Sequence, residues 1–375
     1  MNFSFWEQDT FFSNIDVAIV GSGIVGLNAA IHLKTQQPNL KVAILERGIL
    51  PSGASTKNAG FACFGSVSEL LDNLTKYPQN QVFELVEKRY KGLLKLRNLL
   101  GDDAIGYEGL GGYELFTDSD FYQKCADAID SFNSELRQII GNQVYSNVDS
   151  KINEFGFKNV KNLIFNAYEG QIHTGKMMNS LIALARSKGI EIYNGIKIEK
   201  IEAQTHSVDL VLEDGIIKSK KVIITTNAFA KQLLPELDVV PGRGQVIITK
   251  PIPNLPFKGA FHYDEGYFYF RNVGNRLLFG GGRNLDFKAE ETTEFGFTDL
   301  VQNELHRLLQ EVIIPNLDYE IESRWSGIMG FGSQQAPIVR QISPNIFCAV
   351  KMQGMGVALG SLTGEEVAEM LLSNL

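Results

Sequence analysis

The stretch DVAIVGSGIVG, residues 16–26, decides the fold of this chain. Its first residues are mostly apolar and predict a buried strand, and an apolar pattern with helical periodicity follows the last glycine as far as Lys34. In the G-x-G-x-x-G turn between them, the first glycine allows a tight turn, the second lets the backbone approach a pyrophosphate, and the third packs helix on strand. The N-terminus of the helix favours an anion. The loop residues predicted to bind a nucleotide are Gly21, Ser22, Gly23, Ile24 and Gly26.

A second buried strand is predicted over 41–45, so the segment forms a strand–helix–strand unit. The strand ends at Glu46, 20 residues after Gly26, where an acidic side chain is suited to bind the ribose hydroxyls of adenosine. A carboxylate at this place disfavours the 2′-phosphate of NADP. Arg47 and, later in the chain, Ile198 are further predicted cofactor contacts. The alternative is a glycine-rich turn that binds no nucleotide.

FAD and NAD share this fingerprint, and three features elsewhere favour FAD. The run GASTKNAG, residues 53–60, is small and polar enough to wrap a flat ring, with a flexible surface loop as the alternative. A later buried strand over 222–225 ends in polar residues, at a sheet edge where ligands collect. The sequence GMG at 354–356 precedes the last helix, whose N-terminus would stabilise the negative charge of reduced flavin, although a plain strand-to-helix turn is also open. The predicted flavin contacts are Ser55, Thr56, Asn58, Ala59, Gly60, Thr226, Asn227, Ala228, Gly327, Gln353, Gly354, Met355, Gly356 and Val357.

Length and composition indicate a globular protein with two ordinary domains or one large one. The chain has 375 residues, of which 44% are hydrophobic and 21% charged. Its net charge of −8 disfavours nucleic acid and anionic lipid as partners. The three cysteines are scattered and the five histidines lack metal-ligand spacing, so we expect neither a metal site nor a disulfide framework. No apolar run is long enough to span a bilayer and the opening MNFSFWE is unlike a secretory signal, so we expect a cytoplasmic protein.

Periodicity and turn residues predict the remaining elements. Asp214 and Gly215 separate two alternating runs and predict a hairpin. After residue 235 frequent prolines mark a change to β-rich sequence, and we place a domain crossing near 240. The predicted helices cover 81–100, 121–140, 174–188 and 357–372, and the predicted strands cover 190–193, 208–212, 216–218, 222–225, 246–249, 267–271, 277–279 and 346–350.

Together these residues resemble the flavin-dependent D-amino acid oxidase superfamily, which includes glycine and sarcosine oxidases, D-amino acid dehydrogenases and gamma-glutamylputrescine oxidase. The resemblance covers most of the chain and is carried by residues 16–26, 54–60, 241–245, 324–327 and 354–356. It implies an α/β fold with a Rossmann-like FAD-binding domain, discontinuous in sequence, and an inserted α+β substrate domain built on a mainly antiparallel sheet. We expect the FAD-binding domain at 1–78, 160–238 and 330–375, and the substrate-binding domain at 79–159 and 239–329.

The resemblance also implies a reaction, in which hydride passes from a C–H beside nitrogen to flavin N5 and water hydrolyses the resulting imine. Two departures leave subfamily and substrate open: Lys57 stands where many relatives have arginine, and residues 330–337 lack the Asp-Gly common before this proline. No cysteine or early histidine stands where relatives attach flavin covalently, so FAD is expected to be noncovalent. Since only one dinucleotide fingerprint is present, we expect electrons to come from the substrate and to leave to oxygen, a quinone or another acceptor.

The resemblance places the carboxylate-binding arginine in the segment that holds Arg324, beside Trp325. A guanidinium can hold a carboxylate through two parallel hydrogen bonds. A surface salt bridge is the alternative. On a predicted strand nearby, Tyr267, Tyr269 and Arg271 share one face, which either lines the substrate pocket or packs within the sheet.

The sequence therefore predicts an FAD-dependent enzyme that oxidises a small amino acid or secondary amine. A 2-hydroxyacid dehydrogenase on the same fold is the first alternative, and it would need a base for the alcohol proton, for which His262 is the candidate. A non-catalytic protein that retains the nucleotide-binding fold is the second.

Overall fold

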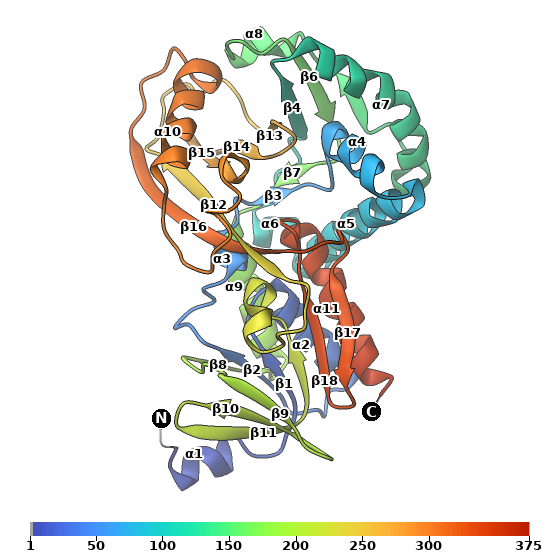
Figure 1. Ribbon diagram of the computed structural model, residues 1–375, viewed down its shortest axis with the longest axis vertical. Helices are drawn as coiled ribbons and strands as arrows, with labels where there is room; N and C mark the ends of the chain where they lie inside the picture. The colour runs from blue at the N-terminus through green and yellow to red at the C-terminus, as the bar shows by residue number, and fades with distance from the viewer. Residues whose placement is uncertain (1–2, 375) are drawn as a thin grey trace.

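The computed structural model describes residues 3–374, which fold around two eight-stranded sheets that follow one another along the long axis of the molecule (Figure 1). Residues 1, 2 and 375 of the predicted FAD-binding domain lie outside the described part. The sheet in the lower half of the view contains the N-terminal nucleotide unit. Its main path runs in the order β17 (Ile338–Ser343), β18 (Ile346–Val350), β11 (Gly215–Ile224), β1 (Ile15–Val20), β2 (Val42–Glu46) and β8 (Glu191–Asn194).

The central strands of this first sheet are parallel and buried. β1 pairs in parallel with β2 on one side and with β11 on the other. β11 in turn pairs in parallel with β18, and β2 pairs in parallel with β8. Strands covered on both faces are expected to read as continuous apolar runs, as β1 and β2 do. Val17 and Ile19 pack into the core on one face, while Ala18 and Val20 pack into the core on the other. The predicted Rossmann-like arrangement is confirmed.

β11 differs from the prediction, which separated a hairpin arm from a later buried strand. The structure has one strand that first pairs antiparallel with β10 (Val208–Leu212), itself next to β9 (Lys200–Ala203). From Ser219 onward the same strand pairs in parallel with β1. The intervening lysines read as a break in the sequence, but their side chains are exposed or half-buried and the backbone pairing continues through them.

Close helix packing brings the two ends of the chain together. α2 (Ile24–Gln36) follows β1, and α11 (Gly356–Leu372) follows β18. The two helices pack against each other. A Cβ atom at Gly364 would lie 2.6 Å from the carbonyl oxygen of Val25 and 2.8 Å from the amide nitrogen of Ala29. Glycine therefore permits the middle of α11 to touch the backbone at the start of α2.

The second sheet, in the upper half of the view, is mainly antiparallel as predicted. Only β13 and β4 pair in parallel among its described neighbours. Its core is rich in aromatic rings, including Phe261 and Phe270, which stack with ring centroids 4.7 Å apart. The strand order is β16 (Ile321–Phe331), β12 (Val240–Thr249), β15 (Arg276–Gly281), β14 (Phe268–Val273), β13 (Ala260–Tyr263), β4 (Gly112–Phe116), β6 (Asn162–Asn166) and β5 (Tyr145–Asn147).

The remaining elements connect and cover the two sheets. The predicted helices over 81–100, 121–140 and 174–188 are confirmed as α5, α7 and α9. The elements are α1 (Phe5–Thr10), α3 (Ala54–Lys57), β3 (Phe61–Ala62), α4 (Val67–Lys76), α5 (Gln79–Leu100), α6 (Asp102–Ile105), α7 (Ser119–Ile140), α8 (Lys151–Phe155), β7 (Gly170–Gln171), α9 (Thr174–Ser187), the 3-10 helices η1 (Asn227–Gln232) and η2 (Arg283–Leu285), α10 (Asp299–Leu308) and the π-helical turn η3 (Leu309–Ile313).

Sheet pairing and helix packing divide the chain differently from the predicted domains at two places. β6 begins at Asn162, inside the expected FAD-binding segment 160–238, yet it pairs with β4 in the second sheet. α5 belongs to the expected substrate segment 79–159, yet it packs on α11, where the Oγ of Ser361 donates to the carbonyl oxygen of Gly92. Local composition does not reveal where β6 and α5 belong, because the pairing of β6 with β4 and the packing of α5 on α11 are formed only in the folded chain.

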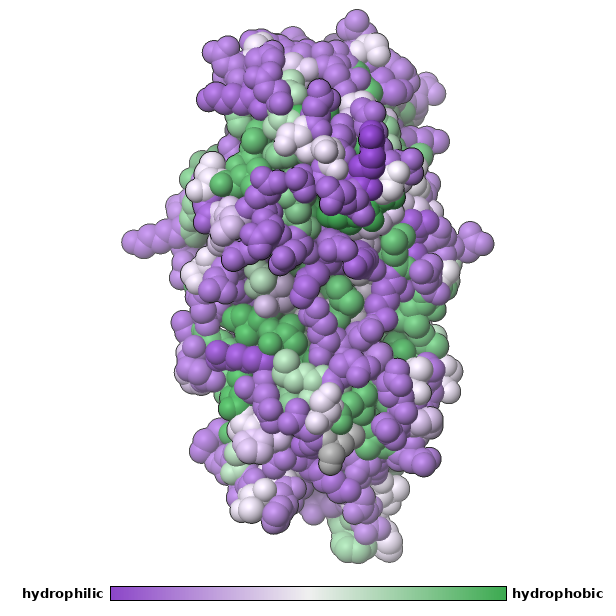
Figure 2. All heavy atoms as spheres, turned by 90° about the vertical axis from the view of Figure 1, so that its right-hand side faces the viewer, coloured by the Kyte–Doolittle hydropathy of each residue, from purple (hydrophilic) through white to green (hydrophobic). Residues whose placement is uncertain are grey.

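The face that carries α5, α7 and α11 is mainly hydrophilic, with separate hydrophobic areas rather than one continuous patch (Figure 2). Within residues 3–374, none of the helices combines the length and hydrophobicity needed to cross a bilayer.

Candidate active site

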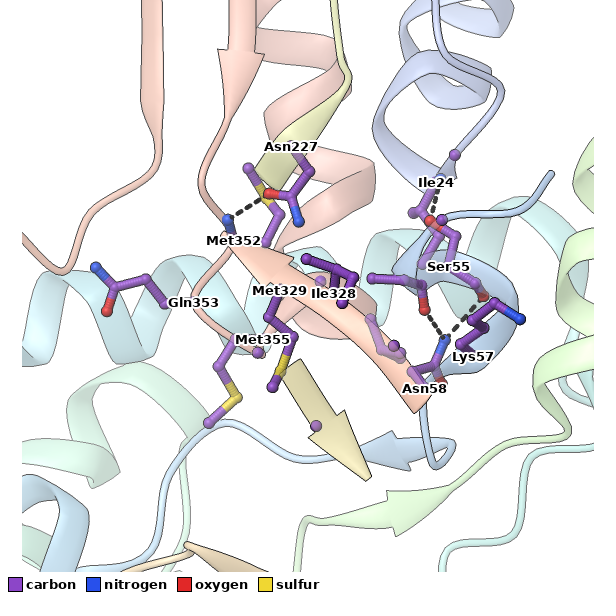
Figure 3. Close-up of a pocket in the computed structure, with 18 of the residues that line it drawn as sticks. Ile24, Ser55, Lys57, Asn58, Asn227, Ile328, Met329, Met352, Gln353 and Met355 are labelled. Atoms are coloured by element: carbon purple, nitrogen blue, oxygen red, sulfur yellow. Dashed lines mark hydrogen bonds between the residues drawn. The ribbon is translucent and has the colours of Figure 1, made fainter. Parts of the chain in front are cut away.

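A cavity of about 520 Å³ joins the two sheets, and its walls come from segments far apart in the sequence. One end is lined by the glycine turn after β1, the loop around α3 and the start of α11 (Figure 3). The other end is lined by β13, β14 and the ends of β15 and β16. The described walls therefore bring the predicted nucleotide site and the predicted substrate sheet into one continuous space.

The glycine turn has the close contacts that its spacing predicts. Gly21 adopts φ +105°, in the region that favours glycine. A Cβ atom at Gly26 would lie 2.1 Å from the carbonyl oxygen of Gly21 and 2.7 Å from the Oγ1 of Thr225. Gly23, at the N-cap of α2, lines the cavity together with Ile24 and Val25, so the N-terminus of this helix faces the cavity. Such a helix start is suited to a pyrophosphate.

Glu46 lines the cavity at the end of β2 and is held in place by the turn. One carboxylate oxygen accepts from the amide and hydroxyl of Ser22 at 3.0 and 2.7 Å, and the other accepts from the amide of Gly48 at 3.0 Å. The second oxygen also accepts a long hydrogen bond of 3.5 Å from the hydroxyl of Ser52. Each oxygen has two acceptor positions, so a ribose hydroxyl would take the place of this long bond. Arg47 and Ile198 line the same end of the cavity, and Arg47 stacks on the ring of Phe229.

The loop around α3 is rigidly hydrogen-bonded. The Oγ of Ser55 accepts from the amide of Ile24 at 3.0 Å, which ties the loop to the start of α2 (Figure 3). The Oδ1 of Asn58 accepts from the amide of Gly60 and from the hydroxyl of Thr174, both at 2.9 Å. This geometry contradicts the alternative of a flexible surface loop, because several separate elements hold the loop in one conformation.

The end of β11 offers an unpaired donor to the cavity. The Oγ1 of Thr226 is buried without a hydrogen-bond partner among the described residues, and Thr226 lines the cavity. A buried hydroxyl left alone is costly, so this atom is suited to a ligand. The Oδ1 of neighbouring Asn227 instead accepts from the amides of Lys351 and Met352 at 2.9 and 3.2 Å, which joins β11 to the chain after β18 (Figure 3).

The structure places most of the predicted site residues in the cavity wall and six outside it. Those in the wall are Gly21, Gly23, Ile24, Glu46, Arg47, Ser55, Asn58, Ala59, Gly60, Ile198, Thr226, Asn227, His262, Tyr267, Tyr269, Gly327, Gln353, Gly354, Met355, Gly356 and Val357. Those outside it are Ser22, Gly26, Thr56, Ala228, Arg271 and Arg324. Ser22 and Gly26 shape the turn from behind, and Thr56 is exposed with its hydroxyl donating to the carbonyl oxygen of Pro51.

The expectation for Arg324 needs correction. Its side chain is exposed, and its guanidinium lies 3.4 Å from the Nε2 of His306. The neighbouring Trp325 points the other way and donates its indole N–H to the carbonyl oxygen of Lys57 at 2.9 Å. Successive side chains of a strand point to opposite faces, so only one of these two neighbours can face the cavity.

The expectation for Arg271 also needs correction. Its side chain is buried beneath the 53–60 loop, where it donates to the carbonyl oxygens of Ala59 at 2.5 Å and Ile172 at 3.0 Å. These bonds consume the donors that would otherwise face a substrate. Arg271 therefore supports the loop from the second sheet instead of lining the substrate end.

A buried histidine–carboxylate pair stands at the substrate end. The Nε2 of His262 lies 3.3 Å from Glu169, which also accepts from the amides of Phe64 at 3.1 Å and Gly65 at 3.3 Å. Burial lowers the pKa of His262, but the hydrogen bond and charge of Glu169 outweigh it and raise the pKa above the usual 6.5. Burial also raises the pKa of nearby Cys63, whose thiol consequently stays protonated and is a poor metal ligand.

Some cavity residues were not predicted. Cys63, Met329 and Arg283 line the wall, and Glu169 supports it from behind. Arg283 directly follows the run Gly280–Gly282, which has no strand and helix in the order of a dinucleotide turn. This glycine run at the end of a strand was the sequence signal that could have pointed to Arg283 as a cavity residue. Glu169 has no local signal, because only tertiary folding brings it to His262.

Comparison with known proteins agrees with this arrangement. The profile of the FAD dependent oxidoreductase family, of the D-amino acid oxidase type, matches residues 16–370. The chain belongs to this family. It is accordingly an FAD-dependent oxidoreductase with noncovalent FAD, and the non-catalytic alternative is wrong.

Curated relatives are similar over almost the whole chain. A probable oxidoreductase OrdL from Rhizobium meliloti is 24% identical over 95% of this chain and 83% of its own length. Glycine oxidase from Geobacillus kaustophilus is 26% identical over 95% of this chain and 92% of its own length. Gamma-glutamylputrescine oxidoreductase from Escherichia coli is 25% identical over 95% of this chain and 83% of its own length.

Solved structures confirm the fold. Glycine oxidase from Bacillus cereus superposes with a TM-score of 0.78 at 18% identity, covering 96% of both chains. Glycine oxidase from Geobacillus kaustophilus superposes with a TM-score of 0.76 at 21% identity, covering 96% of this chain and 94% of the other.

The residues of the cavity fit FAD. The start of α2 is suited to bind the pyrophosphate, and Glu46 is suited to bind the adenosine ribose. The hydroxyl of Thr226, which has no hydrogen-bond partner among the described residues, could bond to the cofactor. The 53–60 loop and the chain around Met355 form opposite walls at which the flavin ring would be held. When bound, FAD supplies an acceptor for two electrons and one hydrogen.

Proposed function

We propose that this protein oxidises the carbon–nitrogen bond of a small amino acid or secondary amine. The substrate would lose a hydride from carbon to FAD and a proton from nitrogen, and the resulting imine would be hydrolysed by water to a carbonyl compound and an amine. Oxygen, a quinone or another acceptor would then remove the two electrons. The single observation that carries the proposal is the continuity of the cavity from the glycine turn to the aromatic wall formed by Tyr267 and Tyr269.

The substrate end suits a small, partly apolar molecule. Tyr269 is half-buried, and desolvation raises its pKa to about 12, so its phenol is a neutral hydrogen-bonding group at ordinary pH. Phe61 and Met329 add apolar surface to the same wall. Such an aromatic wall would limit the access of water to the reacting C–H before the imine is formed.

The relatives support an amine substrate. Among the relatives described above, glycine oxidase and gamma-glutamylputrescine oxidoreductase carry a substrate in their names, and both compounds contain an amine nitrogen. These names belong to proteins about one quarter identical to this chain, so they support a chemical class and not one compound.

A 2-hydroxyacid dehydrogenase is the less favoured alternative, because the substrates named for the relatives are amines. Oxidation of an alcohol needs a base for the hydroxyl proton. His262 lines the cavity and is paired with Glu169, which raises its pKa, so a hydroxyacid would need this imidazole in its neutral form.

Product analysis tests the proposal. The purified holoenzyme is incubated in air, and separately with an artificial electron acceptor, with a panel of amino acids, N-methylated amino acids and matched 2-hydroxyacids. The proposal predicts a carbonyl product together with an equimolar amount of ammonia or amine. Turnover confined to the 2-hydroxyacids, with no nitrogen released, would contradict it and support the alternative.

A further inference from the structure

A second, much smaller cavity adjoins His262. Its volume is about 10 Å³, which is close to the room that a single water molecule needs. Its walls come from β4, β5, β6 and β13 of the second sheet and from the chain around Ser66 and Glu169. Among the described residues, His262 alone lines both this cavity and the main one. The imidazole therefore borders both spaces.

Strand pairing sets polar side chains next to one another in this cavity. β13 and β4 pair in parallel with His262 opposite Glu114, so these two side chains lie on the same face of the sheet. On that face β4 also places Gly112 opposite Asn166 of β6. A Cβ atom at Gly112 would overlap the Oε2 of Glu169, so the glycine leaves the room that this carboxylate occupies.

The unused hydrogen-bonding atoms of the cavity match a water molecule. The Nδ2 of Asn166 is buried and has no hydrogen-bond partner within the described chain. The Oε2 of Glu169 lies 3.3 Å from the Nε2 of His262, and the Oε2 of Glu114 accepts a long bond of 3.3 Å from the amide of Ser68. Each carboxyl oxygen can accept twice. One water can therefore accept from the amide and donate to both carboxyl groups.

Glu114 and Glu169 are the acidic neighbours of His262 that have no arginine or lysine partner in the described part of the chain. The titratable groups around this ring are Cys63, Glu69, Glu114, Tyr145, Glu169 and Tyr269. Glu69 is paired with Arg89 at 2.6 Å. Desolvation raises the pKa of the thiol and of both phenols, so these three groups are neutral at ordinary pH. Burial also raises the pKa of Glu114.

We propose that the second cavity binds one water molecule, which accepts from Asn166 and donates to Glu114 and Glu169. Glu114 is then a positioning residue for His262, because the water joins its carboxyl group to the pair that holds the imidazole. The network sets the orientation and the charge of a ring in the wall of the main cavity. Only groups of this chain and water take part, so the inference does not depend on which substrate is oxidised.

A high-resolution crystal structure of the holoenzyme tests the water site. One ordered water should lie within about 3.2 Å of the Nδ2 of Asn166 and of an oxygen of each carboxyl group. Asn166→Leu removes the donor at nearly the same side-chain size and should lack this water. An empty cavity in the wild type would overturn the inference, as would a direct bond between the two carboxyl groups, a cation in place of the water, or the same water in Asn166→Leu.

NMR titration of isotope-labelled histidine rings in the holoenzyme tests the link to His262 independently of that variant. Glu114→Gln keeps the size of the side chain and removes its charge, so the pKa of His262 should fall. The pKa of His306, which lines neither cavity, should not change.

Glu322→Gln is the matched control, since Glu322 is an exposed carboxylate of the same sheet that is paired with an arginine and lines neither cavity. It should leave the pKa of His262 unchanged. An unchanged pKa of His262 in Glu114→Gln would overturn the role of Glu114, as would an equal fall in both variants.

Failure of this inference and failure of the proposed function are distinguishable, because neither readout uses turnover. If the water and the fall in pKa are found but no amine is oxidised, the water site stands and the proposed function is wrong. If amines yield carbonyl products in a protein whose second cavity is empty, the proposed function stands and this inference is wrong.

Discussion

At the scale of single residues, the site depends on a few side chains whose chemistry is set by what surrounds them. Glu46 and the glycines act where local sequence places them, on the turn between β1 and α2. Arg324 does not, because the pleat of β16 turns it outward while Trp325 faces Lys57. A shift of one position along a strand changes the face, and sequence alone gives no register for β16 against β12.

Gly26→Ala should weaken FAD binding about tenfold or more. The new Cβ would overlap the carbonyl oxygen of Gly21, and relieving such overpacking costs roughly 1–3 kcal/mol, here taken from the geometry of the turn. The dissociation constant of FAD for the reconstituted apoprotein measures the effect. Gly175→Ala, on α9, is the control, since its Cβ would meet only the ring of His173 at 3.3 Å. Equal affinity in Gly26→Ala and wild type would contradict the role of the turn.

His262 and His306 should titrate in opposite directions from the usual histidine value. Glu169 raises the pKa of His262, whereas burial and the charge of Arg324 lower the pKa of His306. NMR of isotope-labelled histidine rings should show His262 protonated above pH 6.5 and His306 deprotonating below it. Glu169→Gln should lower only the first of these values. A common value for the two rings would contradict the pairing.

The pair formed by His262 and Glu169 should stabilise the folded protein more at low pH than at high pH. The pKa of His262 is higher in the folded protein than in the unfolded chain, so its contribution is fully present below the unfolded value of about 6.5. It is lost as pH rises through the folded value. In chemical unfolding, the stability difference between wild type and Glu169→Gln should therefore shrink as pH rises above 6.5. A difference that grows with pH would contradict the assignment.

At the level of helices and strands, the strand–helix–strand unit could be predicted from the sequence, but the contacts that this unit makes with distant elements could not. β1, α2 and β2 are encoded by adjacent residues with clear periodicity. The side chains of Cys63, Glu169 and His262 come within 4.8 Å of one another although they are far apart in the sequence, which no local pattern reveals. The contact of α2 with α11 similarly joins residues more than 300 positions apart in the chain.

Gly364→Ala should destabilise the protein by roughly 1–3 kcal/mol through overpacking, although alanine is ordinarily the better helix residue by about 1 kcal/mol. Its Cβ would press on the backbone of α2 at Val25 and Ala29. A thermal melt of the holoenzyme should show a lower Tm, and FAD affinity should fall because α2 begins at the cofactor site. Gly175→Ala again serves as the control and should melt at or above the wild-type Tm. A Tm for Gly364→Ala equal to or above that of the wild type would contradict the close packing.

At the scale of the whole molecule, the cofactor cavity joins both sheets, so FAD should stabilise the entire described fold. Ligand at 100 times its dissociation constant adds about 2.7 kcal/mol to the free energy of unfolding. Removal of FAD should lower the Tm, and hydrogen exchange should increase both in the 53–60 loop and around Tyr267 and Tyr269. Protection lost only at the glycine turn would contradict a cofactor that reaches both halves.

Anaerobic reduction of the bound flavin would show whether an amine delivers electrons to this protein. The holoenzyme is mixed without oxygen with each member of a panel of amines, amino acids and 2-hydroxyacids, and with NADH and NADPH, while the absorbance of oxidised flavin is recorded. We expect an amino acid or secondary amine to bleach the flavin rapidly, with the nicotinamides having no useful effect because the chain carries one dinucleotide fingerprint. Rapid bleaching by NADH, or by 2-hydroxyacids with no response to any amine, would contradict the account.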